Sequence, residues 1–131
     1  MKTVELTTWM TTLRHQIHAH PELALHETAT TALIKKTLTE LGIRILPYAG
    51  ATGVVAEIGH GQPTVALRAD IDGLPVLEKS DLPFKSTIDG RMHACGHDFH
   101  TAALLGGARL LKEHEAELNG TVRLIFQPAE E

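Results

Sequence analysis

The sequence has few aromatic residues, a single cysteine and no long apolar run. One cysteine excludes an internal disulfide and fits a reducing compartment, so we predict a cytoplasmic location. No apolar stretch is long enough to cross a bilayer, and the N-terminus lacks the apolar run of a signal peptide, so we expect no membrane role. With 4% aromatic residues and a net charge of −4, the chain lacks the stacking side chains and basic face of a nucleic-acid-binding protein.

What the chain does have is the composition of an ordinary globular domain. It is 131 residues long and 43% hydrophobic, which is enough to build a core without disulfide bonds. Nine histidines are the one unusual count. Because imidazole is the commonest metal ligand, this count raises the expectation of metal chemistry.

Hydrophobic periodicity predicts three helices and four strands. The helices are expected over residues 3–18, 27–41 and 100–118. The strands are expected over residues 43–46, 53–58, 64–67 and 121–126. Residues 73–91, rich in Pro, Gly and Asp, are expected to form a long loop, and the Gly106–Gly107 pair indicates close packing of the third helix against a neighbour. Helices alternating with apolar strands predict an α/β domain with an at least partly parallel sheet.

Three polar clusters lie where an expected strand ends or an expected helix begins. They are Arg-Ala-Asp-Ile-Asp at residues 68–72, Met-His-Ala-Cys-Gly-His-Asp-Phe-His at 92–100, and Gln-Pro-Ala-Glu-Glu at 127–131. Ligands of open α/β sheets gather outside the carboxyl ends of the strands. The shared placement therefore predicts that the three clusters form one site.

The second cluster carries a thiol and several imidazoles, which suit zinc, manganese, cobalt or nickel. Cys95 and His97 flank Gly96, whose flexible backbone allows both side chains to face one point. Asp98 is suited either to orient a ligating imidazole or to cap the following helix. The alternative is that Cys95 is a small buried packing residue and the histidines are polar residues at a helix start, and composition alone favours neither reading.

The third cluster ends on two adjacent carboxylates, Glu130 and Glu131. Bringing both together in ionised form is unfavourable unless a positive charge lies between them. A metal ion would bind one carboxylate while the other acts on a metal-bound water. Because neighbours in an extended segment point opposite ways, we expect one to face the metal and the other the substrate. The alternative is a solvated acidic turn.

Asp70 and Asp72 in the first cluster are spaced by two, which puts both on the same side of an extended chain. That placement suits the wall of a site, or an acceptor that orients a ligating histidine. The alternative is ordinary hydrogen bonding at the start of a loop, where Asp is a favoured residue.

The motifs at residues 92–101 (MHACGHDFHT) and 127–131 (QPAEE) resemble those of the amidohydrolase branch of the aminoacylase and glutamate-carboxypeptidase metallohydrolases. This branch includes hippurate hydrolases, indole-acetyl-amino-acid hydrolases and N-acetyldiaminopimelate deacetylases. Residues 14–23 (RHQIHAHPEL) and 68–75 (RADIDGLP) also match its usual stretches. The likeness runs through nearly the whole chain in the expected order.

The resemblance implies a role for each matching residue. Cys95, His97 and Glu131 would ligate metal, and Glu130 would be the general base. Asp70 and Asp72 would support the ligands. Two divalent cations, manganese or zinc with cobalt and nickel also suited, would share the site and activate a water that hydrolyses the amide bond of small N-acyl amino acids. The resemblance gives no ligand role to the remaining histidines of these stretches, which are His15, His18, His20, His93 and His100.

Members of this branch are much longer than 131 residues and carry further histidine ligands. They also carry a smaller domain that closes over the substrate and usually mediates a homodimer. We therefore expect residues 1–131 to be the N-terminal part of a three-layer catalytic domain, inactive alone. Metal-dependent acylase turnover by the purified chain would contradict this expectation.

Two other functions use the same residues. A cysteine hydrolase would use Cys95 as nucleophile and a nearby histidine as base, and it would be sensitive to thiol alkylation but not to chelators. It leaves Glu130 and Glu131 without a role. A non-catalytic metal-binding module would use the ligands for sensing or storage. Glu130→Gln in the longer parent separates this module from an enzyme, because metal binding should survive while hydrolysis collapses.

Overall fold

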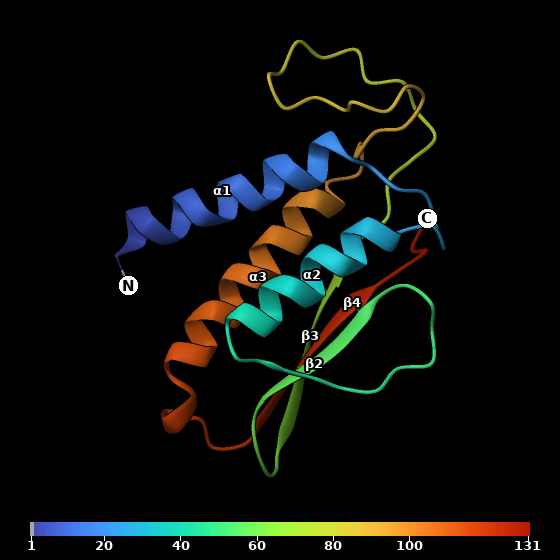
Figure 1. Ribbon diagram of the computed structural model, residues 1–131. Coiled ribbons are helices and arrows are strands. Elements are labelled where there is room, and N and C mark those ends of the chain that lie inside the picture. The colour runs from blue at the N-terminus through green and yellow to red at the C-terminus, as the bar shows by residue number, and fades with distance from the viewer. Residues whose placement is uncertain (1) are drawn as a thin grey trace.

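The computed structural model describes residues 2–131, which form helices stacked against a four-stranded sheet (Figure 1). The helices are α1 (Thr3–Ala19), α2 (Thr28–Glu40), α3 (His97–Glu113) and the short 3-10 helix η1 (Glu115–Glu117). The strands are β1 (Arg44–Ile45), β2 (Val54–Gly59), β3 (Thr64–Asp70) and β4 (Thr121–Gln127). The predicted α/β class is confirmed, and every predicted helix and strand is present.

The sheet is mixed, with strand order β1-β2-β4-β3. β1 and β4 both run antiparallel to β2, whereas β3 and β4 are parallel. In the parallel pair Asp70 lies opposite Gln127, and the Ile71 N–H donates to the Gln127 carbonyl at 3.1 Å. Both strands therefore end at the same edge of the sheet, so the first and third polar clusters leave it side by side, as predicted.

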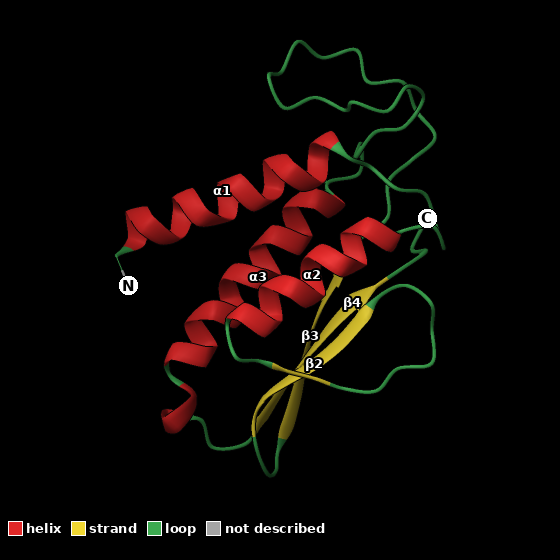
Figure 2. Cartoon of the chain, in the orientation of Figure 1, coloured by secondary structure: helices red, strands yellow, loops and turns green. Residues whose placement is uncertain are grey.

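The three long helices lie on one face of the sheet (Figure 2). α2 and α3 contact the strands, and α1 packs on α3. A Cβ at Gly106 would overlap the sulfur of Met10, so this glycine lets α1 approach α3 closely, as its sequence context predicts. Residues 2–131 thus supply two layers of the expected three-layer arrangement. The core between them is formed by buried apolar side chains, among them Ile34, Leu38, Ala56, Leu105, Leu124 and Phe126.

Helix α3 differs from its prediction at both ends. It begins at His97, three residues earlier than expected, because Gly96 adopts a left-handed conformation (φ 88°) that turns the chain directly into the helix. His97 and Asp98 therefore belong to the first helical turn rather than to the preceding loop. The α-helix ends at Glu113, after which Glu115 accepts a hydrogen bond from the Gly59 N–H at 3.0 Å.

The connection from β3 to α3 is long and has no helix or strand, as predicted for its central part. Isolated bridges pair Leu23 with Gly73 and Leu74 with Met92, which fixes both ends of the loop. Between these points the loop extends beyond the end of α1 (Figure 1, yellow). Of the helices in residues 2–131, none combines the length and apolar character that crossing a membrane requires.

Candidate metal centre

Cys95, His97 and Glu131 each present a ligand atom, and these three atoms lie within 4.8 Å of one another. His97 is the first residue of α3, Cys95 lies just before Gly96, and Glu131 follows the end of β4. His97 is 2% exposed, whereas Cys95 is exposed. The reading of Cys95 as a buried packing residue is therefore wrong, and the thiol is open to a ligand.

Asp72 fixes the orientation of the His97 ring. The imidazole Nδ1 lies 2.8 Å from the Asp72 carbonyl oxygen and 3.1 Å from its Oδ1. Both of these oxygens are acceptors, so Nδ1 carries the hydrogen and donates it. Nε2 is then the ring nitrogen that faces the site, and it is the one through which an imidazole held in this way binds a metal ion.

Three carboxylate oxygens surround this Nε2 atom. Asp70 Oδ2, Glu130 Oε2 and Glu131 Oε1 each lie 3.5 Å from it. These distances are longer than ordinary hydrogen bonds. Two ligands held about 2.1 Å from one tetrahedral ion lie about 3.4 Å apart. The separations thus suit atoms that share a cation, and the thiol, imidazole and carboxylate donors are those that zinc-like ions accept.

Glu130 and Glu131 do not diverge as an extended segment predicts, since both carboxylates approach the same imidazole nitrogen. The chain is bent here because Ala129 takes a left-handed conformation with φ 53°. Asp72, 1% exposed, accepts the Glu130 N–H at 3.1 Å and the Glu131 N–H at 3.0 Å. One carboxylate, that of Asp72, thus holds both the His97 imidazole and the backbone of Glu130 and Glu131.

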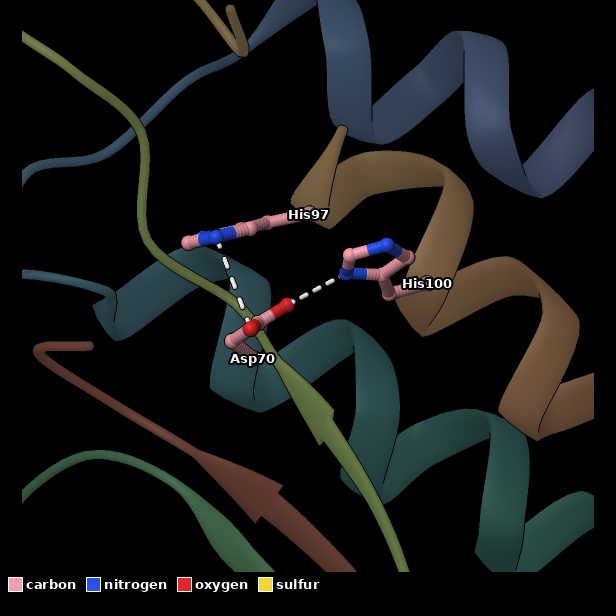
Figure 3. A group of neighbouring side chains, drawn as sticks. All are labelled: Asp70, His97 and His100. Atoms are coloured by element: carbon pink, nitrogen blue, oxygen red, sulfur yellow. Dashed lines mark hydrogen bonds and ion pairs between the residues drawn. The ribbon is translucent and has the colours of Figure 1, made fainter. Parts of the chain in front are cut away.

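Asp70 lies between His97 and His100 (Figure 3). His100 Nδ1 donates to Asp70 Oδ1 at 2.7 Å, and Arg68 approaches Asp70 Oδ2 at 3.4 Å. Burial raises the pKa of Asp70, but the His100 hydrogen bond and the His97 charge outweigh it and hold the pKa below its usual value. Sequence reasoning gave His100 no role, although its spacing of three from His97 places it on the same helical face.

Asp70, His97 and His100 form a second group of ligand atoms within 4.8 Å of one another. Both groups depend on His97, whose Nδ1 is already bonded to Asp72. They therefore compete for one nitrogen and do not describe two separate ions. We take the group with Cys95 as the candidate cation site, because it combines the thiol, imidazole and carboxylate donors that zinc-like ions accept.

The Cys95 thiol keeps its proton in this arrangement. Its pKa is raised, first by a hydrogen bond to Glu131, then by partial loss of solvent around the thiol and by the neighbouring charges of Glu131 and Glu130. A divalent cation between the two side chains would replace that proton, because metal ligation requires the thiolate. The raised pKa also argues against Cys95 as an activated nucleophile, since such cysteines have lowered pKa values.

Asp98 takes part in a different cluster. Its carboxylate, 1% exposed, accepts hydrogen bonds from Arg14 Nε at 3.1 Å and His18 Nδ1 at 2.8 Å. The expectation that Asp98 orients a ligating imidazole is therefore replaced by a role in tying α1 to the start of α3. His18 Nε2 in turn lies 3.0 Å from the Glu78 carboxylate, which connects the long loop to the same cluster. Sequence reasoning did not find this cluster.

His93 is 4% exposed, and neither ring nitrogen has a hydrogen-bond partner within residues 2–131. Burial is the main cause that lowers its pKa to about 4, so the ring is neutral near pH 7. It belongs to neither group of ligand atoms among the described residues.

Comparison of the chain with known proteins identifies the family to which it belongs. The model of peptidase family M20/M25/M40 matches residues 66–131, about half of the chain, and these residues include all three polar clusters. The chain belongs to this family. The resemblance indicated by the motifs is thereby confirmed.

Two curated proteins and one solved structure are similar to the chain over nearly its whole length. N-acetyl-L-cysteine deacetylase of Bacillus subtilis (strain 168) is 59% identical over 121 residues, covering 91% of the chain and 29% of that protein. IAA-amino acid hydrolase ILR1-like 5 of Arabidopsis thaliana is 52% identical over 124 residues, covering 94% and 28%. The Bacillus subtilis YXEP protein, described as a dinuclear metal binding peptidase from the M20 family, matches with a TM-score of 0.95 and 51% identity, covering 98% and 37%. The chain thus spans less than a third of the length of these curated relatives.

Proposed function

We propose that the protein to which this chain belongs hydrolyses the amide bond of N-acyl amino acids at a centre of two divalent metal ions. The observation that carries the proposal is the approach of the Cys95 thiol, His97 Nε2 and a Glu131 oxygen within 4.8 Å, with Asp72 behind the imidazole. The similarity to a deacetylase and an amino-acid conjugate hydrolase supports the substrate class. The dinuclear relative supports the number of ions.

In this proposal Cys95, His97 and Glu131 bind the metal, and Asp72 supports them. When bound, the ions polarise the scissile carbonyl and lower the pKa of a water. Glu130 takes a proton from the attacking water and passes it to the leaving amine as the amide bond breaks. The Glu130 side chain is suited to this work because it is 37% exposed and yet approaches His97. Asp70 holds its place beside the ligands through His100 and Arg68.

The metal and the partners follow from the same proposal. The thiol and imidazole favour zinc, whereas the resemblance points to manganese, with cobalt and nickel also suited. The substrate is a small molecule with an acyl group on an amino acid. The homodimer implied by the resemblance stays a prediction.

The test compares metal binding with hydrolysis. We expect Glu130→Gln to leave cobalt binding by the chain nearly unchanged, and to lower hydrolysis by the complete protein about 10²–10⁴-fold, since it removes the base. Cys95→Ser should weaken cobalt binding itself. Glu117→Gln, at an exposed glutamate of η1, is the matched control for both assays. Unaltered hydrolysis after Glu130→Gln would refute the catalytic assignment, and a purely metal-binding module would be indicated if no acylated substrate is cleaved.

A further inference from the structure

Glu27 is a fully buried carboxylate to which the metal centre gives no obvious role. It lies just before α2 and is 0% exposed. Its Oε1 accepts the Thr52 hydroxyl at 3.1 Å, and its Oε2 accepts the Ala129 N–H at 2.7 Å. The C-terminal residues indeed lie beside the start of α2 (Figure 1). A residue near the start of the chain is thus bonded directly to the segment that carries both glutamates.

The residue that Glu27 holds is the one that bends the chain. Ala129 has φ 53°, a left-handed conformation that is strained for a residue with a Cβ. Such a conformation persists only where the surroundings fix it. The Ala129 N–H is fixed by Glu27, and the next two N–H groups are fixed by Asp72. Three successive amides are therefore bound by two buried carboxylates.

Capping of α2 does not explain Glu27. The side chain of Glu27 makes no capping hydrogen bond to the helix. Glu22 caps α2 instead, since its carboxylate accepts the Ala29 N–H at 3.0 Å and the Thr30 N–H at 2.6 Å. Glu22 thus caps the start of α2, and Glu27 accepts the hydrogen bond from the turn at Ala129.

We propose that Glu27 is a positioning residue of the metal centre, which fixes the left-handed turn at Ala129 and so directs Glu130 and Glu131 toward His97. This inference rests on the proposed metal centre. It assigns Glu27 no contact with metal or substrate, because its two oxygens are taken by Thr52 and Ala129.

The experiment is a cobalt(II) titration of the chain, followed by the thiolate-to-cobalt charge-transfer absorption that reports ligation by Cys95. Glu27→Ala and Glu27→Asp both withdraw the acceptor from Ala129, and we expect cobalt affinity to fall about 10- to 100-fold, the usual effect of losing a group that supports ligands. Glu27→Gln keeps the length and an acceptor oxygen, so its affinity should stay within about threefold of the unaltered chain. Glu22→Ala is the matched control, expected to lower stability with affinity kept within about twofold.

The variants are compared only after circular dichroism shows a native helical signal. If Glu27→Ala does not fold, the Glu27→Asp and Glu27→Gln pair decides. A folded Glu27→Asp variant with unaltered affinity, or a Glu27→Gln variant as weak as Glu27→Asp, would overturn the positioning role. Equal weakening by Glu22→Ala would also overturn it. If the unaltered chain shows no thiolate-to-cobalt absorption, the titration is repeated on the complete protein. If that protein shows none either, the metal centre itself is wrong, and the role of Glu27 falls with it.

Discussion

Asp72 offers the strongest test of how the centre is held together. Its carboxylate is 1% exposed and accepts hydrogen bonds from the His97 ring, the Glu130 N–H and the Glu131 N–H. Asp72→Ala removes both carboxylate oxygens, so the part-buried N–H groups of Glu130 and Glu131 lose their acceptor, whereas the His97 Nδ1–H keeps the Asp72 carbonyl oxygen at 2.8 Å. Each unsatisfied buried donor costs about 1–3 kcal/mol, but such losses are not additive where water can enter.

We therefore expect Asp72→Ala to lower the free energy of unfolding by about 2–4 kcal/mol, because two part-buried backbone donors lose their acceptor. Asp72→Asn keeps the shape and one acceptor oxygen but turns an amide donor toward a backbone N–H, so an intermediate loss of about 1–3 kcal/mol is expected. Cobalt affinity should fall about 10- to 100-fold in both variants, because the His97 ring and the glutamate turn lose their support.

Urea denaturation followed by circular dichroism measures the stability, and a cobalt titration of the folded variants measures the affinity. Asp81→Asn, at an exposed carboxylate in the long loop, is the control and should change neither. Unfolding of Asp72→Ala at the same urea concentration as the control would refute the role of Asp72 in stability. Loss of stability with unaltered cobalt affinity would refute its role in holding the ligands.

Two further predictions concern the surroundings of the centre. Gly53→Ala should destabilise the chain by about 2–4 kcal/mol, because φ is +90° there and a Cβ would lie 2.9 Å from the Phe126 carbonyl oxygen. Gly61→Ala is the control for the backbone strain alone, because φ is +80° there but a Cβ would meet no atom within 4 Å. It should lower the free energy of unfolding by about 1 kcal/mol. Burial raises the pKa of Glu78, but hydrogen bonds from Ser80 and His18 lower it from 4.5 to about 2. The ionised form therefore stabilises the fold above pH about 4.5, and this contribution is lost as the pH falls toward 2. The stability difference between the unaltered chain and Glu78→Gln should shrink over this interval in urea denaturation at successive pH values, and a constant difference would contradict the assignment.

Local patterns in the sequence predicted the fold well, and they also predicted that the three polar clusters lie together. Helical and strand periodicity located each element, and polar residues at strand ends indicated where the site lies. The start of α3 was predicted three residues late, since periodicity carries no signal for the left-handed turn at Gly96. The direction of the Glu130 and Glu131 side chains was missed for a related reason, because the turn at Ala129 is fixed by Glu27, far away in the sequence.

The partners of individual polar residues were the least predictable part. Asp98 was expected to support a ligating imidazole, but it pairs with Arg14 and His18 of α1. That pairing depends on how α1 packs against α3, which no pattern within residues 92–100 specifies. His100 differs in this respect, since its helical spacing from His97 was visible in the sequence and its position next to the site could have been predicted.

The parallel pairing of β3 with β4 has a consequence for how the chain folds. Thr64 pairs with Thr121, and the long loop and α3 lie between the two strands in the sequence. Only the β1–β2 pair joins segments close in sequence. Closing such a large loop costs conformational entropy before the contacts between the strands can form, so parallel pairing is a slow step in folding. Because the residues of the centre leave the ends of these two strands and enter α3, the ligands assemble only when two strands have met that are 57 residues apart at the Thr64–Thr121 pair.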